Sequence, residues 1–351
     1  MKLITIVGAR PQFIKVAAVS RTLREVHDEV LVHTGQHYDS NMSQVFFDEL
    51  EIPPPDYHLE IGSGPHGAQT GAMLAVIEQV LIEEQPERVL VYGDTNSTLA
   101  GALAAAKCSI PVAHVEAGLR GFNRRMPEEI NRIVTDHLAD LLFCPSDTAT
   151  ANLSREGIVR GVHRVGDVMY EALQHAVKQS NRAATFLREW GCAEGRYWLA
   201  TVHRAENTDD RGRLDGILRA LNELAACEPI VFPVHPRTRA MLKEIAFEPA
   251  PGLRVVEPLG YADMAWLLSR ARGVLTDSGG MQKEAYWLRI PCITLRDETE
   301  WVETVEQGWN RLAGADMERI VQCARAIRKP AEGADAYHGT GSVERLIQAL
   351  G

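Results

Sequence analysis

The 351-residue chain lacks the cysteine pattern and the long apolar runs that mark secreted and membrane-spanning proteins. Its six cysteines are scattered without a C-x-x-C pair, which predicts reduced core residues of a cytoplasmic protein rather than a disulfide framework or a zinc site. No run reaches roughly 18 apolar residues, and the best candidate, 99–115, is broken by Lys107 and Pro111. The first residues reach Gly8 and Arg10 before a signal-peptide core can form, so we expect no leader and no membrane partner.

Basic residues are also scarce relative to acidic ones. Lysine and arginine number 37 against 47 acidic residues, which gives a formal net charge of -10. Nucleic acids and anionic membranes both require a basic protein face, so neither is expected as a partner. A local basic pocket for a phosphorylated small molecule is still compatible with this charge.

The turn after the first strand-like run lacks the glycine-rich fingerprint of dinucleotide-binding proteins. It holds one glycine, Gly8, followed by the cations Arg10 and Lys15. This absence disfavours an enzyme that depends on a nicotinamide cofactor. A G-x-G-x-x-G match does occur at 62–67 ("GSGPHG"), but it contains Pro65 and does not follow the first strand. We interpret that segment as a mobile loop at the rim of a cleft.

The sequence is rich in short apolar runs that alternate with helical periodicity. Strands are predicted at 3–7, 30–34, 88–93, 111–116 and 141–146, and again at 197–202, 230–234, 253–259, 273–278 and 292–296. Continuous apolar strands between helices indicate parallel sheets that are covered on both faces. Two such series predict an α/β fold of two doubly wound, Rossmann-like domains that face a cleft.

The length of the chain also favours two domains. We place the boundary between 1–165 and 166–339, because a short strand reaches Gly166 and a new helix begins at Asp167. No Ser/Gly linker or low-complexity segment separates the halves. Ligands of doubly wound sheets bind at the carboxyl ends of the strands, so the residues just after each strand are the candidate site residues.

Polar and charged residues follow nearly every predicted strand. In the first half they are Arg10, Lys15, Gln36, His37, Asp39, Asp94, Thr95, Asn96, His114, Glu116, Arg120, Glu128, Glu129 and Arg132. In the second half they are His203, Arg204, Glu206, Asn207, His235, Arg237, Asp277, Ser278, Gly279, Gly280 and Glu284. Their recurrence at one edge of both sheets favours a functional site over a set of isolated polar residues.

Each of these residues also has a simpler interpretation. Asp94, Ser97 and Ser278 suit the position of a helix N-cap. Glu128 and Glu129 after Pro127 suit the acidic first turn of a helix, which the helix dipole favours. The sequence alone leaves both interpretations open for any single residue.

The segment "TDSGGMQKEA" (276–285) has the most specific local pattern. A strand ends at Asp277, two glycines permit a tight turn, and we expect a helix to begin near Met281. The free N–H groups at such a helix start form a phosphate site. Glu284 is expected within the first turn, where it accepts hydrogen bonds from ribose hydroxyls or caps the helix. This pattern predicts a sugar nucleotide or a similar phosphate ligand.

Seven motifs in this order resemble those of the non-hydrolysing UDP-N-acetylglucosamine 2-epimerase family. They are "GARPQFIK", "HTGQHYD", "VYGDTNST", "HVEAGLR", "PEEINR", "TVHRAEN" and "DSGGMQKEA", and the match extends from residue 1 to about 315. The resemblance implies a glycosyltransferase-B-like fold in which the terminal helix, 340–351, packs back on the first domain. It also implies a homodimer, a UDP-sugar substrate, and chemistry without a nicotinamide cofactor or metal.

The family reaction inverts C2 of the sugar by eliminating UDP to a glycal and adding it back. By their places in the motifs, Asp94, Glu116 and Glu128 are the implied acids and bases at C2, with His203 near the phosphates or the leaving oxygen. Which acid serves which face of C2 stays open. The residues implied to bind the substrate are Arg10, Lys15, Gln36, His37, Arg132, Arg204, Asn207, His235, Ser278, Gly279, Gly280 and Glu284.

Three departures from the family pattern concern the choice of sugar. The usual "RPE" is "RPQ" here, with Gln12, and the usual "TERPE" is "TEWVE", with Trp301 and Val302. The loop before the paired glutamates adds Arg124 and Arg125. These features resemble the subgroup that acts on UDP-2,3-diacetamido-2,3-dideoxy-glucuronate, whose extra carboxylate would pair with either arginine. The alternative is that both arginines are solvated surface charges. Loss of the "ERPE" arginine and proline also makes the parent family's allosteric site doubtful.

Three other functions compete with epimerisation. A UDP-sugar glycosyltransferase shares the fold, but it generally needs one base where this chain offers three acids. A hydrolysing epimerase would release free sugar and commonly carries an added kinase domain. A non-catalytic UDP-sugar sensor would bind the nucleotide and form no product.

Overall fold

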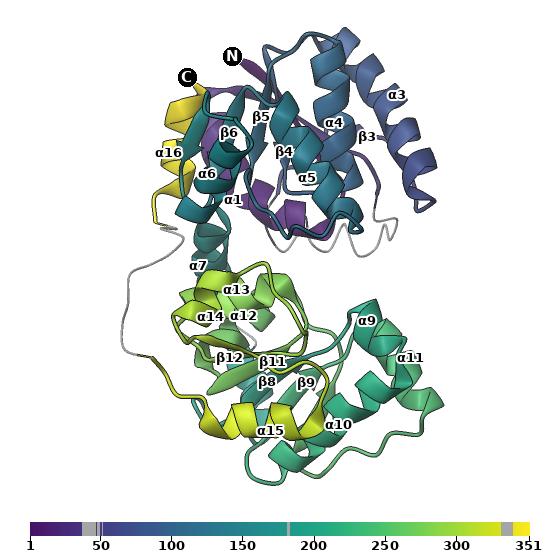
Figure 1. Ribbon diagram of the computed structural model, residues 1–351, viewed down its shortest axis with the longest axis vertical. Coiled ribbons are helices and arrows are strands. Elements are labelled where there is room, and N and C mark those ends of the chain that lie inside the picture. The colour runs from purple at the N-terminus through teal and green to yellow at the C-terminus, as the bar shows by residue number, and fades with distance from the viewer. Residues whose placement is uncertain (37–46, 48–49, 51, 181–182, 331–339) are drawn as a thin grey trace. The chain divides into compact units, whose positions relative to one another are not determined.

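The computed structural model describes residues 1–36, 47, 50, 52–180, 183–330 and 340–351, apart from the side chain of Arg10 (Figure 1). The chain divides into two compact units. Unit 1 comprises Met1–Ala172 and Asp335–Gly351, and unit 2 comprises Leu173–Ala334. Within the described ranges, we find no helix that combines the length and the apolarity required to cross a membrane.

The described residues of unit 1 form a seven-stranded sheet in which all paired strands are parallel. Its strands are β1 (Lys2–Val7), β2 (Asp28–His33), β3 (Tyr57–His58), β4 (Arg88–Tyr92), β5 (Val112–Val115), β6 (Leu141–Cys144) and β7 (Val162–Arg164). They lie in the order β3-β2-β1-β4-β5-β6-β7. The chain therefore winds outward from β1 in both directions, and β1 and β4 flank the topological switch point.

The helices of unit 1 cover both faces of this sheet. They are α1 (Arg10–Val26), α3 (His66–Glu84), α4 (Asn96–Lys107), α5 (Pro127–Leu138), α6 (Asp147–Arg155), α7 (Met169–Gln179, which continues into unit 2) and α16 (Ser342–Leu350). Helices α3, α4 and α5 lie side by side (Figure 1). Ile4 and Ile6 of β1 pack into the cluster that includes α3 and α4, whereas Leu3 and Val7 are buried on the opposite face.

The terminal helix α16 packs against α1, within the same unit. Its first turn is capped by Glu171, whose Oε1 accepts a hydrogen bond from the Ser342 backbone N–H at 2.7 Å. Arg345 donates from Nε and Nη2 to the Val165 carbonyl oxygen at 2.8 and 2.6 Å. These contacts fix the last helix to the end of the seven-stranded sheet.

The described residues of unit 2 form a second parallel sheet, with six strands. They are β8 (Trp198–Thr201), β9 (Ile230–Pro233), β10 (Leu253–Val256), β11 (Gly273–Thr276), β12 (Cys292–Thr294) and β13 (Asn310–Leu312). The order β10-β9-β8-β11-β12-β13 places the switch point between β8 and β11.

Alternate residues of the unit 2 strands enter two separate cores. Trp198 and Ala200 pack with helices α10 (Arg211–Ala225) and α15 (Met317–Ala326), whereas Leu199 packs with α8 (Ala183–Glu189), α12 (Tyr261–Arg270) and α13 (Gly279–Trp287). Figure 1 shows α10 and α15 beside each other on one side of the sheet. The remaining helices are α9 (Ala205–Thr208), α11 (Pro236–Glu244) and α14 (Val302–Glu306). Burial of both faces explains why these strands read as continuous apolar runs.

The predicted fold class, two doubly wound α/β sheets, is confirmed, and all ten predicted strands are present. Two short strands were not predicted, β3 and β13. The interpretation of 62–67 as a loop was wrong in part, because Pro65 is the N-cap of α3 and residues 66 and 67 are helical. The start of the glycine-rich helix was also misplaced: α13 begins at Gly279, so Glu284 lies in its second turn.

Candidate active site

The turn between β1 and α1 lies directly at the switch point of unit 1. Gly8 has no room for a side chain, because a Cβ there would lie 2.0 Å from Thr34 Oγ1 and 2.2 Å from Ser97 Oγ. The buried Gln12 Oε1 accepts hydrogen bonds from the Gly8 and Ala9 N–H groups at 2.8 and 3.0 Å. Its Nε2 donates to the Tyr92 carbonyl at 2.8 Å, so Gln12 ties this turn to the end of β4.

Lys15 and Glu116 form a nearly buried ion pair at the same edge of the sheet. The Lys15 ammonium contacts Glu116 Oε2, and the two side chains are 6% and 10% exposed. A Cβ on Gly93 would lie 3.3 Å from Lys15 Nζ and 3.4 Å from Glu116 Oε2, so the end of β4 packs against the pair. Glu116 has φ +75°, a left-handed conformation that is unusual for a residue other than glycine. Strain of this kind is frequent at functional positions.

Asp94 faces Arg132 and does not cap a helix. Arg132 donates to Asp94 Oδ2 from Nε at 3.0 Å and from Nη2 at 2.6 Å. The N-cap of α4 is instead Thr95, whose side chain accepts a hydrogen bond from the Thr98 N–H. Burial raises the pKa of Asp94, with a further rise from the nearby Glu116 carboxylate, and Arg132 opposes the rise. Such a carboxylate suits proton transfer.

Glu129, which was not among the predicted catalytic or binding residues, is the buried glutamate of the pair in α5. It accepts hydrogen bonds from the Gly121 and Phe122 N–H groups, both at 2.9 Å, and from Arg132 Nη1 at 2.7 Å. Burial works to raise the pKa of Glu129, but these donors together lower it. Glu128 lies half-buried in the same first turn, where no described residue forms a hydrogen bond or ion pair with its side chain. The acidic-turn pattern fits both residues, and only the fold distinguishes them.

Amide side chains complete the described part of this cluster. Gln36 Oε1 accepts hydrogen bonds from the Ser97 N–H at 3.0 Å and the Ser97 hydroxyl at 2.7 Å, so Ser97 is not an N-cap. Asn131 Nδ2 donates to the Asp94 carbonyl at 2.9 Å and to Asn96 Oδ1 at 3.3 Å. Asn96 in turn contacts Gln69 of α3 at 2.8 Å. Helices α3, α4 and α5 are thereby linked around Asp94.

The switch point of unit 2 is organised by Asp277, a fully buried residue at the end of β11. Its carboxylate accepts hydrogen bonds from the His203 N–H at 3.0 Å, the Arg204 N–H at 3.0 Å and Asn207 Nδ2 at 3.2 Å. The His203 ring lies with Nδ1 3.3 Å from Asp277 Oδ1, and 41% of its side chain is exposed. Asp277 was expected at a strand end, but its role was not predicted. It anchors the loop that presents His203.

The N-terminus of α13 lies beside this loop. Ser278 is its N-cap, with the hydroxyl accepting a hydrogen bond from the Met281 N–H at 3.4 Å, which agrees with the simpler interpretation of this residue. Among the described atoms outside the helix's own backbone, a Cβ on Gly280 would meet only Ser278 Oγ, at 3.9 Å, so those atoms leave the helix start open at that position. A Cβ on Gly279 would lie 2.3 Å from Glu300 Oε1. Glu284 is buried, and Tyr261 donates a hydrogen bond to its Oε1 at 3.1 Å.

The other predicted residues of unit 2 differ in exposure. Asn207 is fully buried, and its Nδ2 also donates to the Leu295 carbonyl at 2.9 Å, so it supports the loop from within. His235 is exposed at the N-cap of α11, and its ring centre lies 6.2 Å from that of His203. Arg204 is the N-cap residue of α9. Burial works to raise the pKa of Glu300, but Arg296 and, more weakly, Arg204 lower it.

Several predicted residues have little or no described environment. His37 lies outside the described residues, and of Arg10 the structure describes the backbone alone, at the first position of α1. Arg124 and Arg125 are exposed in the loop before α5. That loop is held at its start by Glu129, through the N–H groups of 121 and 122.

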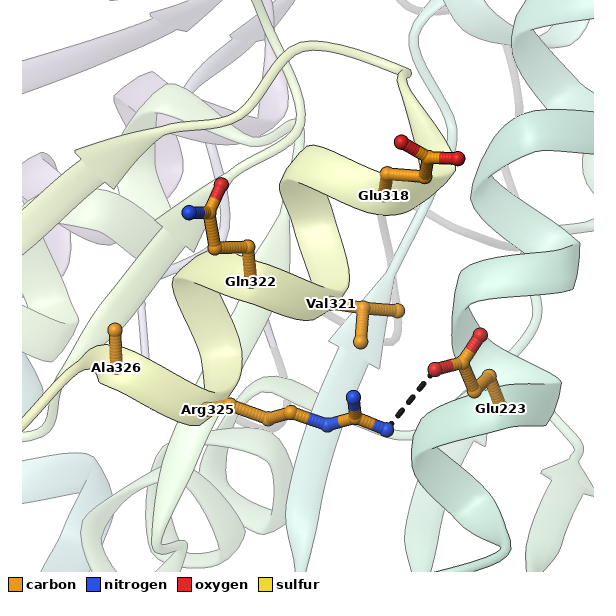
Figure 2. Close-up of a pocket in the computed structure, with 6 residues that line it drawn as sticks. All are labelled: Glu223, Glu318, Val321, Gln322, Arg325 and Ala326. Carbon is orange, nitrogen blue, oxygen red and sulfur yellow. Dashed lines mark hydrogen bonds and ion pairs between the residues drawn. The ribbon is translucent and has the colours of Figure 1, made fainter.

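A groove between α10 and α15 in unit 2 contains none of these residues (Figure 2). It has a volume of about 480 Å³ and is lined by Glu223, Glu318, Val321, Gln322, Arg325 and Ala326. Figure 2 shows the Arg325 guanidinium pointing to the Glu223 carboxylate, and the atoms are 2.9 Å apart. The one cation among the described residues of the groove is thus paired with Glu223, so it offers no free positive charge to a phosphate ligand, and we do not assign the function to it.

Two doubly wound sheets, each with charged residues at its switch point, define a class of α/β enzymes that bind nucleotide ligands there. The chain matches the family model described as "UDP-N-acetylglucosamine 2-epimerase" over residues 21–351. The protein belongs to this family, as its motifs had predicted.

Relatives and solved structures agree with this membership. The chain is 52% identical to a UDP-N-acetylglucosamine 2-epimerase homolog of Methanococcus maripaludis, covering 100% of this chain and 99% of the relative. It is 49% identical to UDP-2,3-diacetamido-2,3-dideoxy-D-glucuronate 2-epimerase of Pseudomonas aeruginosa, covering 99% and 98%. The crystal structure of Methanocaldococcus jannaschii UDP-GlcNAc 2-epimerase in complex with UDP-GlcNAc and UDP superposes with a TM-score of 0.89 at 43% identity, covering 100% and 99%.

Proposed function

We propose that this protein is a non-hydrolysing UDP-sugar 2-epimerase, which inverts C2 by eliminating UDP to a glycal and adding it back. The observation that carries the proposal is the cluster at the switch point of unit 1. There Asp94 and Glu116 lie at the ends of neighbouring strands, each paired with a cation, Arg132 or Lys15. Family membership adds independent support.

Elimination removes the C2 proton, forms the C1–C2 double bond and expels UDP with the electrons of the C1–O bond. The departing diphosphate gains negative charge, which donors placed beforehand stabilise best. We assign this task to the N–H groups at the start of α13. Each hydrogen bond to a charged group contributes roughly 1.5–3 kcal/mol.

The C2 proton requires a base on one face of the sugar and an acid on the other. Asp94, Glu116 and Glu128 are the proposed groups, and His203 is the proposed neighbour of the phosphates. A raised pKa suits Asp94 for both halves of the cycle, because it makes the carboxylate a stronger base than an ordinary aspartate when it accepts the proton from C2. Arg132 holds the Asp94 carboxylate in one orientation.

We further propose UDP-2,3-diacetamido-2,3-dideoxy-glucuronate as the preferred substrate. Support comes from the 49% identity to an epimerase of that name and from the exposed Arg124 and Arg125 beside the anchored start of their loop. UDP-N-acetylglucosamine is the second candidate, because the 52% identical relative is named a UDP-N-acetylglucosamine 2-epimerase homolog. Parallel kinetics on both substrates decide between them. If Arg124 or Arg125 binds the sugar carboxylate, replacement by glutamine raises KM for the glucuronate and leaves KM for the neutral sugar unchanged.

The experiment that tests the activity follows C2 in D2O by NMR. Incorporation of deuterium at C2 of intact UDP-sugar, together with the inverted epimer, supports the proposal. Release of free sugar would instead indicate a hydrolysing enzyme. The absence of both exchange and product would indicate a glycosyltransferase or a sensor.

Single substitutions then assign the two faces of C2. If Asp94 and Glu116 serve opposite faces, a variant that lacks one of them can still remove the proton and return deuterium on the face that the other serves. Asp94→Asn and Glu116→Gln are therefore expected to show deuterium exchange with retention from opposite epimers, with inversion lost. UDP binding, measured by calorimetry, should stay close to that of the wild type. Asp147→Asn, which removes an exposed carboxylate of α6, is the control.

We also propose a cytoplasmic homodimer. All six cysteines fall in the described part of the chain and are free thiols, which is typical of a reducing compartment. The dimer rests on the family resemblance, and sedimentation equilibrium tests it directly.

A further inference from the structure

A row of alternating charges, buried except at its outer end, Glu156, lies beneath the acid-bearing turns of unit 1, which are the two turns that carry Asp94 and Glu116. Glu156 accepts two hydrogen bonds from Arg120, at 2.7 and 2.8 Å. Arg120 Nη1 donates to Asp136 Oδ2 at 2.7 Å, and Asp136 Oδ1 lies 2.7 Å from Nδ1 of His114. The side chains of Asp136 and His114 are both 0% exposed. Unpaired charges at such positions would be costly, so the row depends on its pairing.

The partners of His114 determine what its Nε2 does. Nε2 lies 2.7 Å from the Gly93 carbonyl oxygen, which can only accept a hydrogen bond, so Nε2 is the donor. Nδ1 lies 2.7 Å from Oδ1 of Asp136, whose Oδ2 accepts hydrogen bonds from Arg120 and from the Gly118 N–H. The ring is therefore held between a carboxylate on one side and the Gly93 carbonyl on the other.

These hydrogen bonds end at the backbone of the acid-bearing turns. The Gly93 carbonyl belongs to the peptide unit that links Gly93 to Asp94, and Gly93 has φ +65°. The Gly118 N–H lies two residues after Glu116, and Glu116 and Gly118 both have positive φ. Backbone in these conformations requires support from its surroundings. The buried Asp136 supports the turn of Glu116 directly, through the Gly118 N–H, and it supports the turn of Asp94 through His114.

We propose that His114 is a positioning residue, which holds Asp94 in its reactive place through the hydrogen bond to the Gly93 carbonyl. Asp136 fixes the ring that makes this bond. The inference rests on the proposed function, since it concerns the placement of a group that handles the C2 proton. Misplacement of a reacting group by about 1 Å lowers the rate by about 100-fold.

A matched pair of variants separates positioning from simple packing. In His114→Gln the amide nitrogen takes the place of Nε2, so the bond to the Gly93 carbonyl is kept and the bond to Asp136 is lost. In His114→Asn the amide nitrogen takes the place of Nδ1, so the bond to Asp136 is kept and the bond to Gly93 is lost. Each variant loses one of the two buried contacts of the ring, so thermal unfolding should show comparable losses of stability.

Positioning predicts unequal effects on catalysis. We expect His114→Asn to lower kcat about 100-fold with KM within about threefold of the wild type, and His114→Gln to retain kcat within about fivefold. Equal losses of kcat in two folded variants, or no loss in either, would overturn the proposal. Failure of the epimerase assignment is recognised separately, because the wild-type protein would then show no exchange at C2.

A spectroscopic readout does not depend on activity. In nitrogen-15 spectra of the histidine-labelled protein, the signals that disappear in both variants belong to His114, and they should show a proton on Nε2. A His114 ring without a proton on Nε2 would contradict the hydrogen bond to the Gly93 carbonyl on which the proposal stands.

Discussion

Arg132 directs two of its nitrogens to a single oxygen of Asp94, with Nε 3.0 Å and Nη2 2.6 Å from Oδ2. Its third nitrogen, Nη1, donates to Glu129 Oε2 at 2.7 Å. One guanidinium thus orients the proposed proton carrier and connects it to a glutamate that holds the loop at 121–122. Because the fork of an arginine is rigid, this arrangement fixes the Asp94 carboxylate more firmly than a lysine would.

Removal of Arg132 should shift the pH dependence of activity. Asp94 must be ionised to accept a proton, so kcat/KM rises with pH through the pKa of Asp94 in the free enzyme. Burial holds that pKa above 3.8, and Arg132 opposes this rise. Arg132→Gln should therefore move the acidic limb of the profile to higher pH. The measurement is kcat/KM across the acidic range for the wild type and the variant.

The control for this shift is Arg164→Gln, which removes a guanidinium that pairs with the exposed Asp147. Its profile should coincide with that of the wild type. An acidic limb that stays in place in Arg132→Gln would show that Asp94 is not the group that controls it.

Glu129 should make the fold sensitive to acid. Its pKa is lowered in the folded protein below 4.5, so its contribution to stability is present above pH 4.5 and is lost as the pH falls through the lowered value. Glu129→Gln should reduce stability near neutral pH by about 1–3 kcal/mol, and the difference from the wild type should narrow below pH 4.5. Urea unfolding at a series of pH values measures both effects.

Glu128→Gln provides the comparison, because no described residue forms a hydrogen bond or ion pair with the Glu128 side chain. This variant loses only the favourable interaction of the charge with the N-terminus of α5, so its stability near neutral pH should fall by less than about 1 kcal/mol. If the difference between Glu129→Gln and the wild type does not depend on pH, the lowered pKa of Glu129 is refuted.

The fold could be predicted from the sequence because both faces of each sheet are buried. That burial leaves continuous apolar runs between amphipathic helices, and every predicted strand was found. The two missed strands, β3 and β13, are only 2 and 3 residues long and lie at sheet edges, where no apolar run is required. The start of helix α3 was not predicted, because a proline N-cap followed by His66 and Gly67 resembles a loop.

The sequence predicted the site only as far as the residues that follow each strand. Strand-end position predicted Asp94, Lys15 and Glu116, which the fold does bring to one edge. It did not separate Glu129 from Glu128, because adjacent residues share every local pattern and differ only in which tertiary partners they meet. The pairing of Lys15 with Glu116 was likewise hidden, since 101 residues separate the partners.

Gly8 should tolerate no side chain. In Gly8→Ala the new Cβ would lie 2.0 Å from Thr34 Oγ1 and 2.2 Å from Ser97 Oγ, so the β1–α1 turn must move. Overpacking of this kind costs about 1–3 kcal/mol, and the displaced turn should also weaken UDP-sugar binding. Gly71→Ala is the control, because no described atom lies within 4 Å of the position its methyl group would take, and helix α3 favours alanine. Equal melting temperatures for the two variants would contradict the steric account.

The two glycines of α13 should respond differently to alanine. A Cβ on Gly280 meets no described protein atom closer than Ser278 Oγ at 3.9 Å, and it lies in a helix, so Gly280→Ala should be neutral or slightly stabilising. If a diphosphate binds the N–H groups there, the methyl group obstructs it, and UDP affinity should fall about tenfold, or about 1.4 kcal/mol. In Gly279→Ala the Cβ would lie 2.3 Å from Glu300 Oε1, and Arg296 holds Glu300 at 3.0 Å. That variant should lose stability. Calorimetric titration with UDP and thermal unfolding separate the two effects, and unchanged UDP affinity in Gly280→Ala would exclude a phosphate site at the start of α13.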